Sequence, residues 1–401
     1  MRHTFATIVL VVASINCTNA APTLREAVEQ AARRNPDIQG LKARIEEARA
    51  RGLSARSLTP APPALTVGAR HDNLLLDQQR GTREYEVEIE VPLWLPGQRA
   101  AAGANARTLE VAYAAGAEAS RLLVAGEVRE QAWAVALERA ELAAARRRME
   151  TALAVESLVA KRLKAGDVAR GDLLQAQDEV LAARGVVADS EFGVRRTLAI
   201  FAALTGFEEI PALIEEPIAG KADLDRHPRF LAMTAAAENA RTVVHAANEF
   251  RRDPPSLLLQ NRGDRSTTTS YQNENTIRLN VRIPFATDAR NLPRIASAQA
   301  DLTQALAQAQ RERAQLEAAV QSATAALDTT RLQVEIAQSR DRLTQEALRL
   351  ARRGFELGET PFVSVLLTLA RAVDSDRVLA RARVALGLAE ARFNQAAGVL
   401  P

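Results

Sequence analysis

The chain consists of two copies of one pattern, the second displaced from the first by 192 positions. Pro92 falls on Pro284, Gly166 on Gly358 and Gly206 on Gly398, with no net insertion along the way. Matches that stay in order at constant spacing indicate a duplicated half rather than an array of short solenoid repeats. Whatever fold one half adopts, we expect the other half to adopt it as well.

Each copy switches abruptly from a strand pattern to a helix pattern. In "EYEVEIEVPLWLPGQR", which starts at Glu84, apolar and charged residues alternate, as in a strand with one apolar and one wet face. The segment "ENTIRLNVRIPFATDAR", which starts at Glu274, repeats this alternation, and a shorter run precedes each of the two. The predicted strands lie at about 64–70, 84–93, 256–262 and 275–285.

Long proline-free segments follow both strand pairs, at 97–210 and 294–360, and are rich in alanine, leucine, glutamate, glutamine and arginine. These residue types have high helix propensity. An unbroken helix over 97–165 would be roughly 100 Å long at 1.5 Å per residue. Its apolar positions are mostly alanine, which favours close packing against a returning helix and neighbouring rods.

Glycines interrupt both helical segments and predict hairpin tips at 162–172 and 354–364. Gly166 and Gly358 can take the left-handed conformation that ends a helix. Thr360 and Pro361 are interpreted as the N-cap and the first residue of the second returning helix.

The N-terminus has the pattern of an export signal. A short polar start precedes the apolar run "FATIVLVVASI", which is too short to span a membrane, and small residues lead to a cut after Ala20. The only cysteine, Cys17, lies inside this segment, so the mature chain is predicted to lack disulfides and thiol chemistry. Lipidation of Cys17 is an alternative that the preceding Ser14-Ile15-Asn16 disfavours.

The expected organisation is a signal peptide, two repeats and a crossover linker rich in proline. These parts are assigned to residues 1–20, 21–206 for the first repeat, 207–226 for the linker and 227–401 for the second repeat. Each repeat is expected to contain a helix, two strands, a very long helix and a returning helix. The first helix is predicted to begin at Thr23, to run through Ile38 and Ala48 and to end near 52–63.

Several classes of function lack support in the sequence. The net charge of +3 is small for 401 residues, so nothing indicates a nucleic-acid partner. We find no phosphate loop, no G-x-S-x-G and no histidine near a plausible nucleophile, so the chain is not expected to be an enzyme. The histidines at positions 71, 227 and 245 are far apart in the sequence, and neither a metal site nor a cofactor is expected.

Four amphipathic strands are too few to close a membrane barrel, and an open sheet edge is not viable in lipid. The strands must therefore be pooled between chains. Two chains would give eight strands and a filled interior, whereas three would give twelve strands and an open lumen. We predict the trimer, with a lumen lined by Glu86, Glu88, Glu90, Arg278, Asn280 and Arg282.

These features resemble the TolC family of outer-membrane efflux factors. The resemblance covers essentially the whole mature chain and includes the duplication, the "NPDIQ" segment, the junction "VPLWLPGQR", the tip "RLKAGDVARGDLLQAQDEV" and the ending "NQAAGVLP". It implies a mainly α fold with a membrane β-barrel portion: a homotrimeric channel-tunnel with a twelve-stranded barrel in outer-membrane lipid and a periplasmic α-helical tunnel. It also implies a passive channel that serves a periplasmic adaptor and an inner-membrane pump.

By this resemblance, the adaptor docks on the tip turns. The residues concerned are Arg162, Leu163, Gly166, Asp172, Phe355, Gly358, Thr360 and Pro361. Asp172 matches an acidic position that some members use in closing the periplasmic end, although its carboxylate could equally stabilise the start of the returning helix. The chain departs from the best-known member at Thr360, where that member has a basic residue, and at Ser364 and Leu367, where it has acidic ones.

The segments "LPGQR", "IPFATDARN" and "AAGVLP" look most like the heavy-metal branch of the family. The alternative for the whole chain is a periplasmic coiled-coil adaptor or scaffold, which would also be exported, helical and rich in alanine. Strand pairs in the middle of each half argue against it, because an adaptor needs one helical hairpin inserted between β-rich domains.

Overall fold

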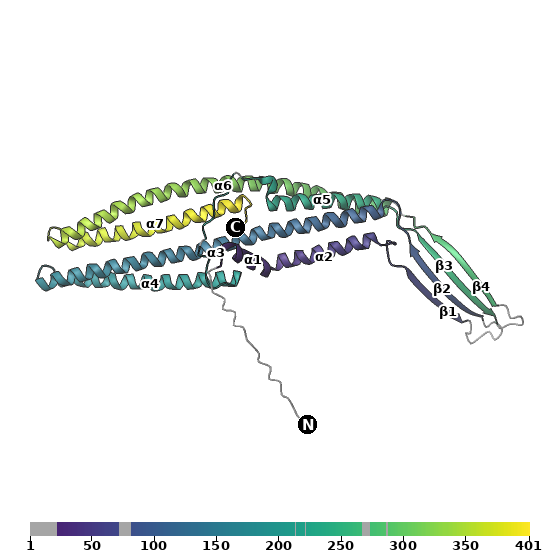
Figure 1. The fold of residues 1–401 in the computed structure, drawn as a ribbon, viewed down its shortest axis with the longest axis horizontal. Helices are drawn as coiled ribbons and strands as arrows, with labels where there is room; N and C mark the ends of the chain where they lie inside the picture. Colours follow the sequence, from purple (N-terminus) through teal and green to yellow (C-terminus); the bar gives the residue numbers. More distant parts are fainter. Residues whose placement is uncertain (1–21, 72–81, 213, 221, 267–272, 286–287) are drawn as a thin grey trace, which may run out of the picture.

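The computed structural model describes residues 22–71, 82–212, 214–220, 222–266, 273–285 and 288–401. The predicted export signal, with Cys17, and most of the two loops between paired strands lie outside the described residues. Figure 1 shows an elongated molecule in which long helices run side by side and a sheet projects from one end.

The described elements of the first repeat are α1 (Leu24–Arg34), α2 (Pro36–Arg56), β1 (Ala64–His71), β2 (Thr82–Pro92), α3 (Gln98–Ala165) and α4 (Arg170–Thr205). The linker contains η1 (Leu224–Arg226), and the elements of the second repeat are α5 (Pro228–Glu249), β3 (Ser256–Ser266), β4 (Asn273–Arg282), α6 (Asp288–Glu356) and α7 (Phe362–Ala396). The predicted fold class is confirmed, because both halves place two strands before a very long helix and a returning one.

The prediction of a single opening helix was wrong at Asn35. This residue takes an extended backbone (φ −71°, ψ 123°), since a following proline disfavours the helical conformation, and α1 therefore ends there. Its side-chain Oδ1 accepts hydrogen bonds from the backbone N–H groups of Asp37 (3.0 Å) and Ile38 (3.1 Å), which starts α2 at Pro36. The predicted capping box at Thr23 and Glu26 is present at the start of α1.

The sheet is antiparallel in the order β1-β2-β3-β4. Its register sets Glu88 beside Thr66 of β1 and Gln260 of β3, so polar side chains share one face. On the other face, Val87 and Ile89 are 43% and 42% exposed although they are apolar and lie in an inner strand. The described residues therefore leave that apolar face uncovered.

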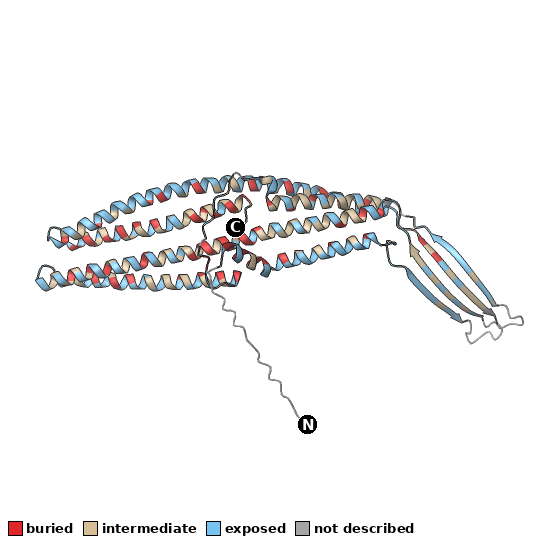
Figure 2. Ribbon diagram, in the orientation of Figure 1, coloured by how far each residue is buried: buried red, intermediate tan, exposed pale blue. Residues whose placement is uncertain are grey.

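Helix α3 is the centre of the helical part and contacts α1, α2, α4, α5 and α7. It forms a hairpin with α4, and α6 forms a second hairpin with α7. Figure 2 shows buried residues recurring along the helices while the sheet is mostly exposed or intermediate. Among the described residues, no helix combines the length and the apolar character needed to cross a membrane.

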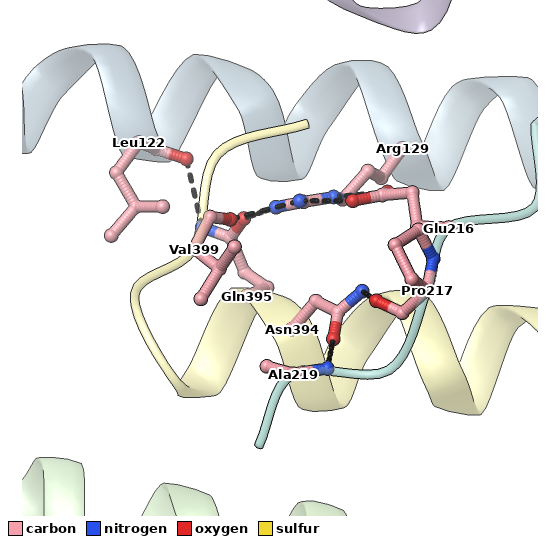
Figure 3. A network of polar contacts seen from close by, with 8 residues as sticks. All are labelled: Leu122, Arg129, Glu216, Pro217, Ala219, Asn394, Gln395 and Val399. Carbon is pink, nitrogen blue, oxygen red and sulfur yellow. Dashed lines mark hydrogen bonds and ion pairs between the residues drawn. The ribbon is translucent and has the colours of Figure 1, made fainter. Parts of the chain in front are cut away.

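A buried polar network joins α3 to the segment between the repeats and to the end of the chain (Figure 3). Arg129 of α3 is 2% exposed and binds both carboxylate oxygens of Glu216, at 2.7 and 2.6 Å. Its guanidinium also donates to Gln395 Oε1 (2.6 Å) and to the carbonyl of Val399 (2.9 Å). Nearby, Asn394 accepts a hydrogen bond from the Ala219 N–H (2.7 Å). These contacts hold three remote segments together at the middle of the helices.

Candidate functional site

The first hairpin tip is a compact turn closed by glycine. Helix α3 ends at Ala165, and Gly166 takes the left-handed conformation (φ 85°, ψ 7°) as expected from the sequence. The N–H of Asp167 donates to the carbonyl of Arg162 (3.0 Å), which completes the helix-ending motif. Asp172 lies in the first turn of α4, where its Oδ2 accepts a hydrogen bond from the Ala169 N–H (3.2 Å). The Asp172 carboxylate therefore stabilises the start of its own helix.

The second tip resembles the first but begins its returning helix differently. Gly358 is again left-handed (φ 81°), and the Glu359 N–H donates to the Gly354 carbonyl (2.9 Å). The assignment of Thr360 as N-cap was one residue too early. Pro361 is the N-cap, because its extended ψ of 152° delays the helix to Phe362. Thr360 instead donates its N–H to the Gly354 carbonyl (3.2 Å) within the turn.

Arg162 joins the two tips within one chain. Its Nη1 donates to the Phe355 carbonyl (2.6 Å), and its guanidinium lies 4.6 Å from the centroid of the Phe355 ring. The Arg162 side chain is only 19% exposed and also approaches Asp167 (3.6 Å). Of the eight predicted tip residues, Arg162 and Phe355 are in direct contact. Gly358 lies beside them, since a Cβ there would be 3.7 Å from Arg162 Nη2.

Apolar side chains from all four hairpin helices pack together behind the tips. The buried members include Val159 of α3, Ala176 of α4, Phe355 of α6 and Phe362 of α7. The rings of Phe355 and Phe362 lie 5.8 Å apart at 49°. Sequence reasoning missed Phe362 and Val159, although helical spacing around the tips was a usable signal. Leu163, Asp172, Thr360 and Pro361 remain within their own turns.

The six residues predicted to line a lumen lie on the polar face of the sheet. Glu90 of β2 pairs with Arg282 of β4 (3.1 Å), across β3, and the two occupy equivalent positions in the repeats. Glu86 hydrogen-bonds Gln260. Sequence reasoning missed Glu84 and its partner Arg262, which are joined at 2.7 Å. The charges on this face are therefore cross-linked between the two repeats.

A family model described as "Outer membrane efflux protein" matches residues 27–206, which contain the first strand pair and the first hairpin. The matched residues, somewhat less than half of the chain, therefore resemble the outer membrane efflux protein family. The predicted resemblance to TolC-type channels is confirmed. No curated protein sequence matches the chain.

Several solved structures share the fold of this chain over nearly its whole length. A structure of CusC is 17% identical, with a TM-score of 0.78 over 94% of this chain and 92% of that one. VceC from Vibrio cholerae is 16% identical, with a TM-score of 0.74 over 94% and 96%. The open state of MtrE from Neisseria gonorrhoeae is 17% identical, with a TM-score of 0.74 over 95% and 90%.

A groove of about 800 Å³ extends from behind the tips toward the middle of the molecule, between α4 and α7 and over α3. It is lined by Glu141, Ala145, Asp178, Asp189, Leu369 and Arg377, among others. Several of its charges are already paired, as Glu141 is with Arg377 (3.1 Å). Among the described residues, no group of three or more histidine, cysteine, aspartate or glutamate side chains is arranged to hold a metal ion.

Proposed function

We propose that this protein is the outer-membrane channel of a tripartite efflux system and conducts its substrate passively. The observation that carries the proposal is the combination of a family match with two long helical hairpins and one four-stranded sheet whose apolar face is uncovered. Such a face needs a cover, and lipid is the cover available to an exported protein of this family. The helical part would extend into the periplasm.

A homotrimer would provide hydrogen-bond partners for both edges of the sheet. Strands β1 and β4 are at its edges, and their unpaired backbone groups need partners in lipid. Three chains would join edge to edge into a twelve-stranded barrel, with the apolar face toward lipid and the polar face toward the lumen. In this arrangement Glu86, Glu88, Glu90, Arg278, Asn280 and Arg282 would line the channel.

The helices also carry a surface suited to a neighbouring copy. We call it the α6 stripe: Ile336, Leu343 and Leu350 of α6 with Leu357 directly after its end, spaced by seven residues and 58%, 72%, 62% and 58% exposed. Apolar residues at this spacing form the seam of a coiled coil. Helix α4 has exposed leucines with the same spacing, Leu174 and Leu181. We propose that the α6 stripe of one chain packs on α4 of the next and closes the tunnel wall.

The tips would meet the periplasmic adaptor, which in turn would connect the channel to an inner-membrane pump. The eight tip residues predicted from the sequence are the proposed docking set, with Arg162 and Phe355 holding the two turns in one arrangement. The groove between α4 and α7 would offer the adaptor a helix-sized surface next to the tips. Energy for transport would come from the pump.

The same proposal includes export through a signal peptide that is cut after Ala20. It also includes the division of the chain into repeats at 21–206 and 227–401, with a linker at 207–226. The heavy-metal branch is part of it as well and rests on "LPGQR", "IPFATDARN" and "AAGVLP". Metal cations would then be cargo selected by the pump rather than bound by this chain.

Fractionation and conductance together test the proposed channel. The full chain should sediment with outer membranes, migrate as a trimer before heating and give discrete single-channel conductances in planar lipid bilayers. An adaptor or scaffold would wash off, or would follow the inner membrane, and would not conduct. Silent bilayers with correctly extracted, folded trimers would contradict the channel.

A further inference from the structure

The two repeats start their second helical segment with the same device but with different chemistry. Asn35 and His227 occupy equivalent positions, and each is followed by proline at the first residue of a helix, α2 or α5. Asn35 caps α2 through its amide oxygen. His227 caps α5 through Nδ1, which accepts a hydrogen bond from the Arg229 N–H (3.2 Å). An imidazole thus stands where the first repeat has an amide.

The His227 cap requires a neutral ring. A nitrogen can accept a hydrogen bond only while it carries no proton, so the neutral ring must hold its proton on Nε2. In the imidazolium both nitrogens are donors, and the Arg229 N–H would then lose its acceptor. The amide of Asn35 does not titrate, so the equivalent cap in the first repeat is independent of pH.

His227 is enclosed by the last residues of the chain. It is 2% exposed, and its ring lies directly under Gly398, where a Cβ would be 2.6 Å from the ring Cδ2. Gly398 has a left-handed backbone (φ 77°), so glycine is required there on two counts. The Nε2 atom is buried without a hydrogen-bond partner among the described residues. The Gln395 carbonyl lies close enough to attract its proton weakly but does not complete a bond.

Burial of the ring and one nearby cation oppose a second proton. Burial, and then the Arg229 guanidinium, lower the pKa of His227 below its usual 6.5, and the Gln395 carbonyl offsets this only in part. Glu312 of α6 pairs with Arg229 (2.9 Å), and Asp225 of η1 pairs with Arg313 (3.1 Å). Residues 395–399 of the C-terminal segment contribute no ionisable side chain.

We propose that His227 forms an acid-sensitive joint between α5 and the C-terminal segment Gln395–Val399. Protonation removes the cap, moves the charged ring toward water and releases the segment that covers it. Gln395 and Val399 both accept hydrogen bonds from Arg129, so their release also weakens the network between α3 and Glu216 (Figure 3). The effect would reach the middle of the molecule without involving the tips or the sheet.

The direction of the pH effect follows from the lowered pKa. In the unfolded chain the imidazole binds a proton as the pH falls through 6.5, while the folded ring stays neutral until a lower pH. The neutral ring therefore contributes fully to the free energy of unfolding above pH 6.5. This contribution decreases as the pH falls below 6.5 and is lost once the pH reaches the pKa of the folded state. The inference does not depend on the channel function.

Hydrogen exchange on the full mature chain tests the joint. Backbone amides of 395–399 in the wild-type protein should lose roughly tenfold protection, after correction for intrinsic rates, between about pH 7.5 and about pH 5. His227→Asn keeps an acceptor at the cap, as in the first repeat, and should lose little. His245→Asn, at an exposed position on the same helix, should behave as wild type.

A second measurement needs no variant. Exchange at the imidazole C2 position of the wild-type protein, followed by mass spectrometry, gives a titration midpoint for each histidine. His227 should titrate below the usual 6.5 of an imidazole, and the loss of protection at 395–399 should follow the His227 midpoint. An ordinary midpoint for His227, or equal acid-induced loss in wild type and His227→Asn, would overturn the proposal.

Discussion

At the scale of single residues, two helices pack closely where one of them has a glycine, which has no side chain. Trp133 of α3 is 6% exposed and its ring lies against Gly387 of α7. An added Cβ at Gly387 would stand 2.6 Å from two atoms of the indole, Cζ2 and Cζ3. The contact between Trp133 and Gly387 could not be predicted from the sequence, because it forms only when the two hairpins pack together. The left-handed Gly166 and Gly358, by contrast, were predictable from local pattern alone.

Gly387→Ala should therefore destabilise the protein by about 1–3 kcal/mol, since overpacking must displace the ring or the helix. Gly185→Ala on exposed α4, where a Cβ would meet nothing within 4 Å, is the matched control. It should be neutral or stabilising by up to about 1 kcal/mol, because alanine favours a helix. Thermal unfolding followed by circular dichroism measures both. Equal melting temperatures for the two variants would show that Trp133 relaxes freely.

At the scale of elements, the long helices were the most predictable part. Helix α3 spans Gln98–Ala165, close to the predicted 97–165, because an alanine-rich segment without proline has no competing structure. The delayed start of α7 was not predictable, since the extended backbone of Pro361 accompanies the packing of Phe362 on Phe355. The partners of Arg129 were also beyond reach, because Gln395 lies 266 positions away.

At the two tip glycines, backbone strain can be tested without a steric clash. A Cβ at Gly166 would meet nothing within 4 Å, and one at Gly358 only Arg162, at 3.7 Å. Gly166→Val with Gly358→Val should therefore strain the two turns, by about 1 kcal/mol or more each, without a clash. We expect normal trimers with impaired efflux, because the distorted tips would no longer match an adaptor.

Trimer abundance and resistance to the exported substrate, measured in the same cells, decide this. Gly171→Val is the control, since Gly171 lies in the first turn of α4, has no positive φ and a Cβ there would be in open space. Full resistance in the double variant would show that the tips are not the docking surface. Loss of trimer would show that the two glycines are needed for folding.

At the scale of the whole molecule, the described part of the chain leaves two apolar surfaces exposed: the outer face of the sheet and the α6 stripe. The sequence predicted the first, because alternation shows which side chains share a face. It did not predict the second, because the side of α6 that faces α7 is known only from the structure. Both surfaces lead to expectations about assembly.

The facing of the sheet can be tested by two neighbouring residues of β2. Val87→Arg would place a charge in lipid and should cost about 2–4 kcal/mol near the membrane midplane, so that assembly falls. Glu88→Gln, on the opposite face, should assemble normally and change the ion preference of the conductance. The yield of heat-dissociable trimer in outer membranes is the measurement. Similar yields for both variants would contradict the proposed facing.

The α6 stripe can be tested without touching the sheet. Leu343→Glu with Leu350→Glu should weaken trimers, because each leucine buried at an interface contributes about 1.5–3 kcal/mol. Gln338→Glu adds one charge at an exposed position of α6 outside the stripe and should leave trimers intact. The mass of the detergent-extracted particle distinguishes the outcomes. An unchanged trimer mass in the double variant would mean that another surface holds the tunnel together.

The pair between Glu90 and Arg282 has a consequence for how this gene could have changed after its duplication. Two identical halves would have carried the same residue at both positions, so the attraction between opposite charges can have arisen only once the copies differed. The halves have since become complementary parts that are no longer interchangeable. In a chain made of two first halves, a glutamate would replace Arg282, and two carboxylates would repel each other on the polar face of the sheet. A barrel assembled from six separate first halves would contain this repulsion at every repeat.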